Sequence, residues 1–345
     1  MNTNQKLAWG LTGLGAILAL AKIRQKSTNL AGQTVLITGG SSGLGLLLAR
    51  EFAREGCRLV ICARGEAKLE QARLALREIG AEVLAIPCDV SDRVQVYELV
   101  KQATRAFGQI DILVNNAGVI QVSPVENVKL ADFEQAMDIM FWGVLYPIMA
   151  VLPQMQERHG GRIVNITSIG GKVSVPHLLP YASAKFAAVG LSEGLRAELA
   201  KDGITVTTIA PGLMRTGSYL NALFKGKQSE EYTWFTLGAS LPFISMAAEA
   251  AARQIVQATK HGEAERILSI PANLLARFHG LFPGVTSDLL GIVSTLLLPY
   301  GQAMDGSTLE GRAVQAELSP MRKQVLDLLT VLGRQATQQF QPYPE

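Results

Sequence analysis

Cysteine and histidine are scarce in this 345-residue sequence, and neither forms a cluster. The three cysteines, Cys57, Cys62 and Cys88, have no metal-type spacing and lie in or beside apolar runs. The four histidines stand singly. Zinc sites need closely spaced ligands and disulfide frameworks need paired cysteines. We therefore expect buried thiols in a reducing compartment, no metal and no zinc-dependent hydrolysis.

An excess of charge of one sign is also lacking. Lysine and arginine number 32 against 29 aspartates and glutamates, which gives a net charge of +3. No basic block or basic–aromatic stripe marks a nucleic-acid interface, so we expect no nucleic-acid partner. With 48% hydrophobic and 18% charged residues, the composition is that of a globular chain with a substantial core.

One long uncharged run opens the chain, at residues 7–21, and a cluster of Lys22, Arg24 and Lys26 follows it. A helix of this length spans about 22 Å at 1.5 Å per residue, short of the ~30 Å hydrocarbon layer. Trp9 and the cationic cluster resemble interface anchors. Membrane contact from the cytoplasmic side is the preferred interpretation. A helix folded back on the protein and a cleaved signal ending near Ala21 stay open.

From residue 34 onward, short β-branched runs alternate with amphipathic stretches, and this alternation predicts the fold. Buried parallel strands are expected at 34–38, 58–62, 82–86, 111–115, 162–167, 204–210 and 266–270, with helices at 44–55, 66–79, 92–106, 131–157 and 182–201. The pattern predicts a doubly wound parallel α/β sheet of Rossmann type, which binds ligands at the carboxyl ends of its strands.

The expected organisation is an apolar N-terminal segment (1–30), one dinucleotide-binding domain (31–270) and a mostly helical C-terminal extension (271–345). Within the extension, residues 289–299 suit a core or interfacial helix because they are too few to span a bilayer. Residues 301–318 are expected to form a polar loop, and 319–337 a last helix.

A glycine-rich turn, "TGGSSGLG" at 38–45, joins the first strand to the first helix. Such glycines let backbone N–H groups approach a pyrophosphate at a helix N-terminus, where the helix dipole favours negative charge. The predicted cofactor-binding residues of this turn are Gly39, Ser41, Ser42, Gly43, Leu44 and Gly45.

Arg64 follows the second strand, at the position that selects the dinucleotide. A carboxylate there would bind the free ribose 2′-hydroxyl of NAD, whereas an arginine accommodates the 2′-phosphate of NADP. Arg64 therefore favours NADP(H), although a solvated arginine at a loop start gives the same pattern.

Other polar residues and turns follow the later strands. Asp89, with Val90, ends the third strand, where its carboxylate suits an adenine amino group. Asn116 and Gly118 of "NNAG" follow the fourth strand, and Ser168 the fifth. After the sixth strand come Pro211, Gly212 and Thr216, which could close over the nicotinamide. All are predicted to lie at the edge where this fold binds ligands.

Tyr181 and Lys185 stand four residues apart in "YASAK", so they share one face of the predicted helix. Taken alone, the pattern is common and is better described as a partly buried tyrosine beside a solvated lysine. Together with the glycine turn, Asp89-Val90, NNAG, Ser168 and Pro211-Gly212 with Thr216, it resembles the short-chain dehydrogenase/reductase family over about residues 32–270.

The resemblance implies a mechanism of NADPH-dependent carbonyl reduction. Tyr181 would be the general acid, Lys185 would lower the tyrosine pKa and bind the nicotinamide ribose, and Ser168 would position the substrate oxygen. Ser168 has no His or Asp partner motif, which argues against a serine hydrolase.

Met140 departs from the family pattern, because it stands where the resemblance expects an asparagine that interrupts the helix and holds a water of the proton relay. A thioether is only a weak acceptor. The alternative function is therefore a catalytically impaired NADP-binding sensor or scaffold.

Substrate and assembly are less sharply indicated. Residues 171–181 and 214–243 are expected to form the pocket walls. The apolar side chains of 214–243 suit either a bulky, lipid-like carbonyl compound or a loop that covers the protein's own core. The resemblance also implies a homo-oligomer assembled through the long helices 131–157 and 182–201.

Overall fold

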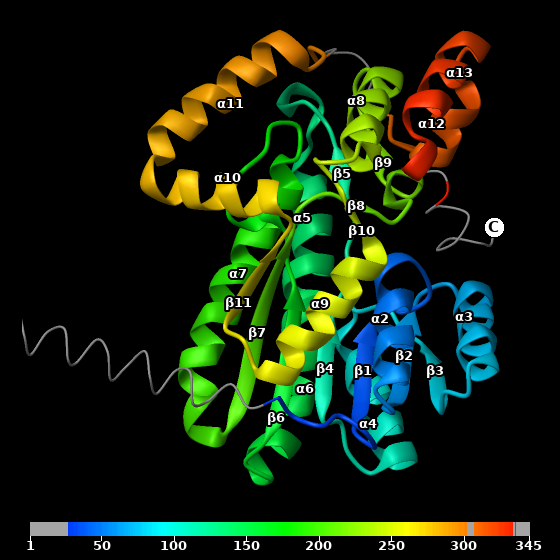
Figure 1. The fold of residues 1–345 in the computed structure, drawn as a ribbon, viewed down its shortest axis with the longest axis vertical. Coiled ribbons are helices and arrows are strands. Elements are labelled where there is room, and N and C mark those ends of the chain that lie inside the picture. Colours follow the sequence, from blue (N-terminus) through cyan, green and yellow to red (C-terminus); the bar gives the residue numbers. More distant parts are fainter. Residues whose placement is uncertain (1–26, 302–306, 334, 336–345) are drawn as a thin grey trace, which may run out of the picture.

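A computed structural model describes residues 27–301, 307–333 and 335. Its centre is a seven-stranded sheet in the order β11-β7-β6-β4-β1-β2-β3 (Figure 1). The strands are β1 (Thr34–Thr38), β2 (Arg58–Ala63), β3 (Val83–Pro87), β4 (Ile112–Asn115), β6 (Gly161–Ile166), β7 (Ile204–Pro211) and β11 (Glu265–Leu268). All neighbours pair in parallel, and the strand order reverses between β1 and β4. This confirms the predicted doubly wound sheet.

Alternating side chains of the strands pack into two separate cores. On β1, Val35 and Ile37 join the core beneath α2 (Gly43–Arg54), α3 (Glu66–Glu78) and α9 (Ala248–His261), whereas Leu36 faces the opposite core. That second core lies under α4 (Arg93–Phe107), α6 (Gly143–Glu157) and α7 (Leu179–Leu199). Because both faces are covered, the strands are apolar throughout, which is the signal that predicted them.

A long helical stretch crosses one face and changes geometry in its middle. α5 (Leu130–Met137) continues through a π turn, η2 (Asp138–Trp142), into α6, and the Gly143 amide bonds the Asp138 carbonyl. Within the described part of the chain, this stretch is the one helix long and apolar enough to cross a membrane. It packs against α4 and α7, and 39% of its most apolar window is buried.

A third apolar cluster forms beside the sheet. β5 (Gln121–Val122), β9 (Leu223–Phe224) and β12 (Leu309–Glu310) make a small sheet, and α8 (Gln228–Ser240), α12 (Gly311–Glu317) and α13 (Pro320–Leu329) surround it. The polar-loop prediction for 301–318 is wrong over 307–318. There Gly311 lets its backbone approach the Tyr219 carbonyl, and Val314 and Leu318 are buried in the cluster.

The aromatic residues of 214–243 belong to the same cluster. Tyr219, Phe224, Tyr232 and Phe235 are all buried in it. Of the two interpretations of this segment, the one in which it covers the protein's own core therefore describes these side chains.

The remaining elements connect or extend these layers. They are the paired strands β8 (Met214–Arg215) and β10 (Met246–Ala247), the short turns η1 (Val125–Asn127), η3 (Ile169–Gly171), η4 (Ala200–Asp202) and η5 (Ser218–Leu220), and the helices α10 (Ile270–Leu281) and α11 (Pro283–Leu297). The last two form a hairpin that extends away from the sheet (Figure 1). The segment 7–21 lies outside the described residues.

Candidate active site

The glycine turn brings the end of β1 against the start of α2. Gly39 and Gly43 adopt φ values of +65° and +54°, which side chains rarely tolerate. At Gly45 an added Cβ would lie 2.1 Å from the Gly39 carbonyl oxygen, so the close approach requires glycine. Ser42 is the N-cap of α2, and its side chain forms no capping hydrogen bond. Ser41 and Leu44 complete the turn. The result is a small, backbone-lined cradle at a helix N-terminus, which fits a pyrophosphate.

Asn116 fixes this turn from the neighbouring strand. Its Nδ2 donates to the carbonyls of Thr38 and Gly39, at 3.0 and 3.2 Å. In return, Thr38 Oγ1 accepts from the amides of Asn116 and Ala117, at 2.9 and 3.1 Å. The ends of β1 and β4 are therefore joined at the point where the strand order reverses, which is where this fold binds ligands.

Arg64, Asp89 and Val90 lie farther along the same edge. Arg64 is exposed directly after β2. One carboxylate oxygen of Asp89 accepts from the Ser91 amide at 3.0 Å and from its hydroxyl at 2.7 Å, which fixes the side chain. Val90 is buried and would contact any Cβ added to Gly143, so it also supports the π turn.

The predicted residues after β7 lie on the other side of the switch point. The Gly212 amide donates to the Leu268 carbonyl at 3.2 Å, next to Pro211. Thr216 is buried, and its Oγ1 accepts from the Ser218 amide at 3.3 Å. They form a turn over the carboxyl ends of β7 and β11.

Ser168 and Tyr181 meet where β6 ends and α7 begins. Ser168 caps η3 by accepting from the Gly170 amide at 3.0 Å, and its hydroxyl lies near enough to Tyr181 to lower the tyrosine pKa. A Cβ added to Gly170 would lie 3.1 Å from the Tyr181 ring and 3.4 Å from Ser168 Oγ. Glycine at this position lets the two side chains approach.

Lys185 lies one turn further along α7, beneath Tyr181. It is buried, its Nζ donates to the Ile166 carbonyl at 3.0 Å, and it lies 5.7 Å from the Tyr181 ring centroid. Burial lowers the lysine pKa to about 8. The Ile166 carbonyl was not predicted, because a backbone acceptor leaves no trace in residue type.

The tyrosine pKa differs from the sequence-based expectation. Burial raises the pKa of Tyr181, and the Ser168 hydrogen bond opposes this shift. Lys185 is not among the groups that shift this pKa here, so its expected effect on the tyrosine stays a prediction. The apolar surroundings penalise tyrosinate, and the ammonium group is bound to a carbonyl rather than to the phenol oxygen.

A buried polar network beneath α7 was also missed. Asn115 donates to Asn165 at 2.9 Å, Asn165 donates to Ser192 at 3.0 Å, and Thr208 donates to Ser192 at 2.7 Å. The four side chains are buried and connect β4, β6, β7 and α7. The Asn115 amide oxygen has no partner among the described residues, and the bonds of Asn165 and Thr208 to Ser192 join α7 to β6 and β7.

Met140 is buried in the π turn and faces α7. It packs with Ala136 and Ala184 and with the half-buried Tyr181. A Cβ added to Gly118 would lie 3.7 Å from Met140 Sδ and 3.8 Å from Lys185 Nζ, so all three residues border the same small space. The π turn thus persists without the asparagine that the resemblance expects.

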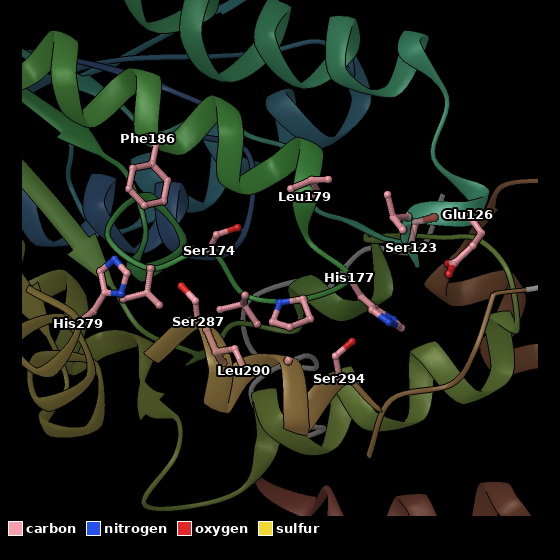
Figure 2. Close-up of a pocket in the computed structure, with 15 residues that line it drawn as sticks. Ser123, Glu126, Ser174, His177, Leu179, Phe186, His279, Ser287, Leu290 and Ser294 are labelled. Atoms are coloured by element: carbon pink, nitrogen blue, oxygen red, sulfur yellow. The ribbon is translucent and has the colours of Figure 1, made fainter. Parts of the chain in front are cut away.

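A separate cavity of about 410 Å³ lies under the C-terminal hairpin. Residues 173–177 and Leu179 form one wall and α11 the other (Figure 2). His177 stands in this wall at φ +63°, and its Nδ1 is 2.8 Å from the buried Glu231 carboxylate, which also accepts from Trp234 Nε1 at 2.7 Å. Ser168, Tyr181 and Lys185 do not line the cavity.

These features define a dinucleotide-binding α/β oxidoreductase. The family model for short chain dehydrogenases matches residues 33–223, more than half of the chain. The protein belongs to the short-chain dehydrogenase/reductase family, whose fold binds a nicotinamide cofactor.

Curated relatives match the same region. Rat 17-beta-hydroxysteroid dehydrogenase 13 is 38% identical over 198 residues, covering 56% of this chain and 66% of the relative. A putative ketoacyl reductase of Streptomyces coelicolor is 40% identical over 189 residues, with coverages of 53% and 71%. The matched region thus spans about two thirds of each relative.

Two solved structures share the architecture. L-Sorbose reductase from Gluconobacter frateurii, complexed with NADPH and L-sorbose, superposes with a TM-score of 0.64 at 26% identity, covering 71% of this chain and 97% of that one. A short chain dehydrogenase/reductase from Burkholderia phymatum in complex with NAD gives 0.69 at 24% identity, with coverages of 75% and 96%. The second comparison supports the fold alone.

Proposed function

We propose that the protein is an NADPH-dependent reductase of ketones or aldehydes, with Tyr181 as general acid. The observation that carries this proposal is the meeting of Ser168 and Tyr181 above the buried Lys185, at the sheet edge that carries the glycine cradle. A hydroxyl donor, a positioning hydroxyl and a cation beside a dinucleotide site are the groups that carbonyl reduction requires.

The roles follow from where the charges develop. The reduced nicotinamide, when bound, supplies a hydride to the carbonyl carbon. Ser168 orients the carbonyl oxygen by a hydrogen bond, and Tyr181 delivers the proton that turns the developing alkoxide into an alcohol. The raised pKa of Tyr181 keeps the phenol protonated at neutral pH, as a proton donor in the reductive direction must be. Lys185, whose pKa burial lowers to about 8, lies 5.7 Å from the Tyr181 ring centroid and would return the proton.

Each residue of the cradle is proposed to bind one part of the dinucleotide. The backbone of residues 39–45 would bind the pyrophosphate, Asp89 the adenine amino group and Lys185 the nicotinamide ribose. Asn116, Gly118, Pro211, Gly212 and Thr216 would border the nicotinamide half. Arg64 supports NADPH over NADH because an exposed guanidinium beyond β2 can bind the 2′-phosphate through two hydrogen bonds.

The substrate class is proposed from the relatives. One relative is named a hydroxysteroid dehydrogenase and another a ketoacyl reductase, which favours an apolar or lipid-like carbonyl compound. Assembly as a homo-oligomer through α5–α6 and α7, and membrane association on the cytoplasmic side, are part of the same proposal.

The test is NADPH and NADH oxidation by the purified, detergent-supported chain. The panel contains small ketones, aldehydes, steroids and long-chain keto-lipids, with Tyr181→Phe as the blank. Turnover that disappears in Tyr181→Phe supports the reductase. NADPH binding without turnover on any carbonyl would instead favour the second candidate, an impaired NADP-binding sensor or scaffold, for which Met140 is the motivating residue.

Arg64→Ala tests the cofactor assignment in the same assay. Losing a charge-assisted pair worth about 1.5–3 kcal/mol should lower kcat/KM for NADPH by about tenfold or more, with little change for NADH. Arg77→Ala, an exposed arginine on α3, is the matched control. Equal losses with both cofactors would contradict a 2′-phosphate role for Arg64.

A further inference from the structure

The hairpin of α10 and α11 exposes most of its large apolar side chains. Twelve residues between positions 270 and 300 are large, apolar and exposed, out of thirty such residues in the described chain. Leu281 and Leu296 have 74% and 73% of their surface exposed. The same stretch contains two charged residues, Arg277 and Asp288, and one histidine. Contiguous exposed apolar surface of this kind marks an interaction site.

An ordinary surface helix packs its apolar face on the protein. α11 instead turns most of its large apolar side chains outward. Ser287, Leu290, Gly291 and Ser294 line the cavity on its inner side, and Figure 2 shows Leu290 and both serines on the cavity wall. The outward face is formed at helical spacing by Val285, Leu289, Ile292, Val293, Leu296 and Leu297. A helix that turns mostly small residues inward and most of its large apolar residues outward is adapted to an apolar exterior rather than to water.

The shape of the hairpin favours a lipid surface over a second protein. α10 packs mainly on α11 and β11, and the turn between the two helices projects at the edge of the molecule, while α11 runs back over residues 173–177 (Figure 1). The tip of the hairpin is apolar as well as its side, with Leu281, Phe282 and Val285 all exposed. A flat contact with a second copy would cover one side of the hairpin, whereas a bilayer surface can accept its tip and its outward face together.

The length of α11 limits how deeply it can enter a bilayer. Its 15 residues span about 22 Å, which is too short to cross the ~30 Å hydrocarbon layer. The exposed Arg277 and Tyr300 are residue types that extend to the headgroup level. A helix of this length and pattern lies in the interface plane with its apolar face in the acyl boundary.

We propose that the α10–α11 hairpin docks shallowly into a lipid bilayer. The site is independent of the N-terminal segment 7–21 and of the hydride-transfer chemistry. It would place the wall formed by residues 173–177, next to α7, close to the membrane surface.

The test uses a fluorescent probe in the full chain, so that contact by residues 7–21 cannot imitate it. The three native cysteines are buried, and Leu296→Cys therefore offers one reactive thiol for an environment-sensitive NBD label. Val94→Cys on α4, where Val94 is 75% exposed, is the matched control. Vesicles of phosphatidylcholine with phosphatidylglycerol are added, with doxyl-labelled lipids as depth quenchers.

We expect vesicles to raise and blue-shift the emission at position 296 and to leave position 94 unchanged, with quenching strongest from shallow doxyl groups. Adding Leu289→Asp should lower the vesicle-inserted fraction at position 296 by about tenfold or more, because the apolar contact of one leucine is lost and a charge replaces it. If the protein sediments with vesicles but the emission of the label at position 296 does not change, the proposal is overturned and another part of the chain makes the membrane contact. A rise that follows protein concentration without vesicles would overturn it in favour of a second copy.

Discussion

Two surfaces meet at the reacting end of the site, and they match the family to different degrees. The α7 side keeps both residues that the family motif requires, Tyr181 and Lys185, above a buried polar network. The π-turn side, residues 138–142, keeps the shape of the helix interruption but carries Met140 in place of the expected asparagine. Side-chain chemistry is thus retained on one side and backbone geometry on the other.

This difference shows that the π turn does not depend on an asparagine side chain. Gly143 ends the turn with its amide on the Asp138 carbonyl and packs against Val90, where a Cβ would lie 2.7 Å from the valine. π turns are frequent at functional sites because they displace the backbone by one residue. Losing the asparagine therefore alters what the turn can bind, while its shape is held by glycine.

The largest expected effect comes from removing one hydroxyl on the α7 side. Tyr181→Phe should lower kcat/KM by about 10²–10⁴-fold, the usual contribution of a general acid. The matched change on the other side is Tyr146→Phe on α6, where the half-buried tyrosine stacks on Trp142 with ring centroids 5.8 Å apart. In steady-state kinetics, kcat/KM of the two variants should differ by at least about 10²-fold. Similar losses would mean that the two sides share the proton transfer.

Much of the α7 side could be predicted from sequence, because it consists of side chains at fixed spacing. The Tyr181–Lys185 pair, Ser168 and the glycine turn all lie at the sheet edge where the strand pattern placed them. The Ile166 carbonyl and the Asn165–Ser192 bond could not be predicted, since a backbone acceptor and a contact between distant residues leave no local pattern. Their catalytic roles stay predictions.

The π-turn side and the C-terminal region were harder to predict for a related reason. A helix interruption without Pro, or a short strand such as β12, depends on contacts with segments far away in the chain. β12 pairs with β9, more than 80 residues earlier. Apolar composition also did not tell an internal core from an exposed surface. The aromatic residues of 214–243 turned out to be buried, and the leucines of α11 exposed.

A second, smaller effect should appear in the pH dependence of stability. The pKa of Lys185 is lowered to about 8 by burial, so the unfolded chain binds more protons than the folded one between pH 8 and the ordinary lysine range. The contribution of Lys185 to the free energy of unfolding therefore rises by about 3 kcal/mol as pH increases across that interval. It falls by the same amount when pH returns to 8.

The difference in free energy of unfolding between Lys185→Met and the natural chain isolates the contribution of Lys185. Burial raises the pKa of Tyr181, and that of Cys57 to about 12, and both groups make stability fall at high pH in either protein. Urea unfolding from pH 7 to 10 should show Lys185→Met more stable than the natural chain at pH 7, with the gap closing as pH rises. A constant gap would mean that Lys185 is not desolvated in the folded state.

The smallest effect is expected from Met140→Asn. Because Gly143 and Val90 already hold the π turn, the substitution changes the polarity next to Lys185 and leaves the shape of the turn unchanged.

An amide at position 140 could restore hydrogen-bonding capacity for a proton relay. We expect kcat to rise by less than about tenfold, or 1.4 kcal/mol. Ala136 and Ala184 offer the new amide no polar side chain, and an unpaired buried amide costs about 1–3 kcal/mol, so Tm should fall. Met140→Leu, which keeps an apolar side chain, separates the two causes. A rise in kcat in both variants would point to packing, whereas a rise confined to asparagine, with a changed solvent isotope effect, would show that the π-turn side limits proton transfer.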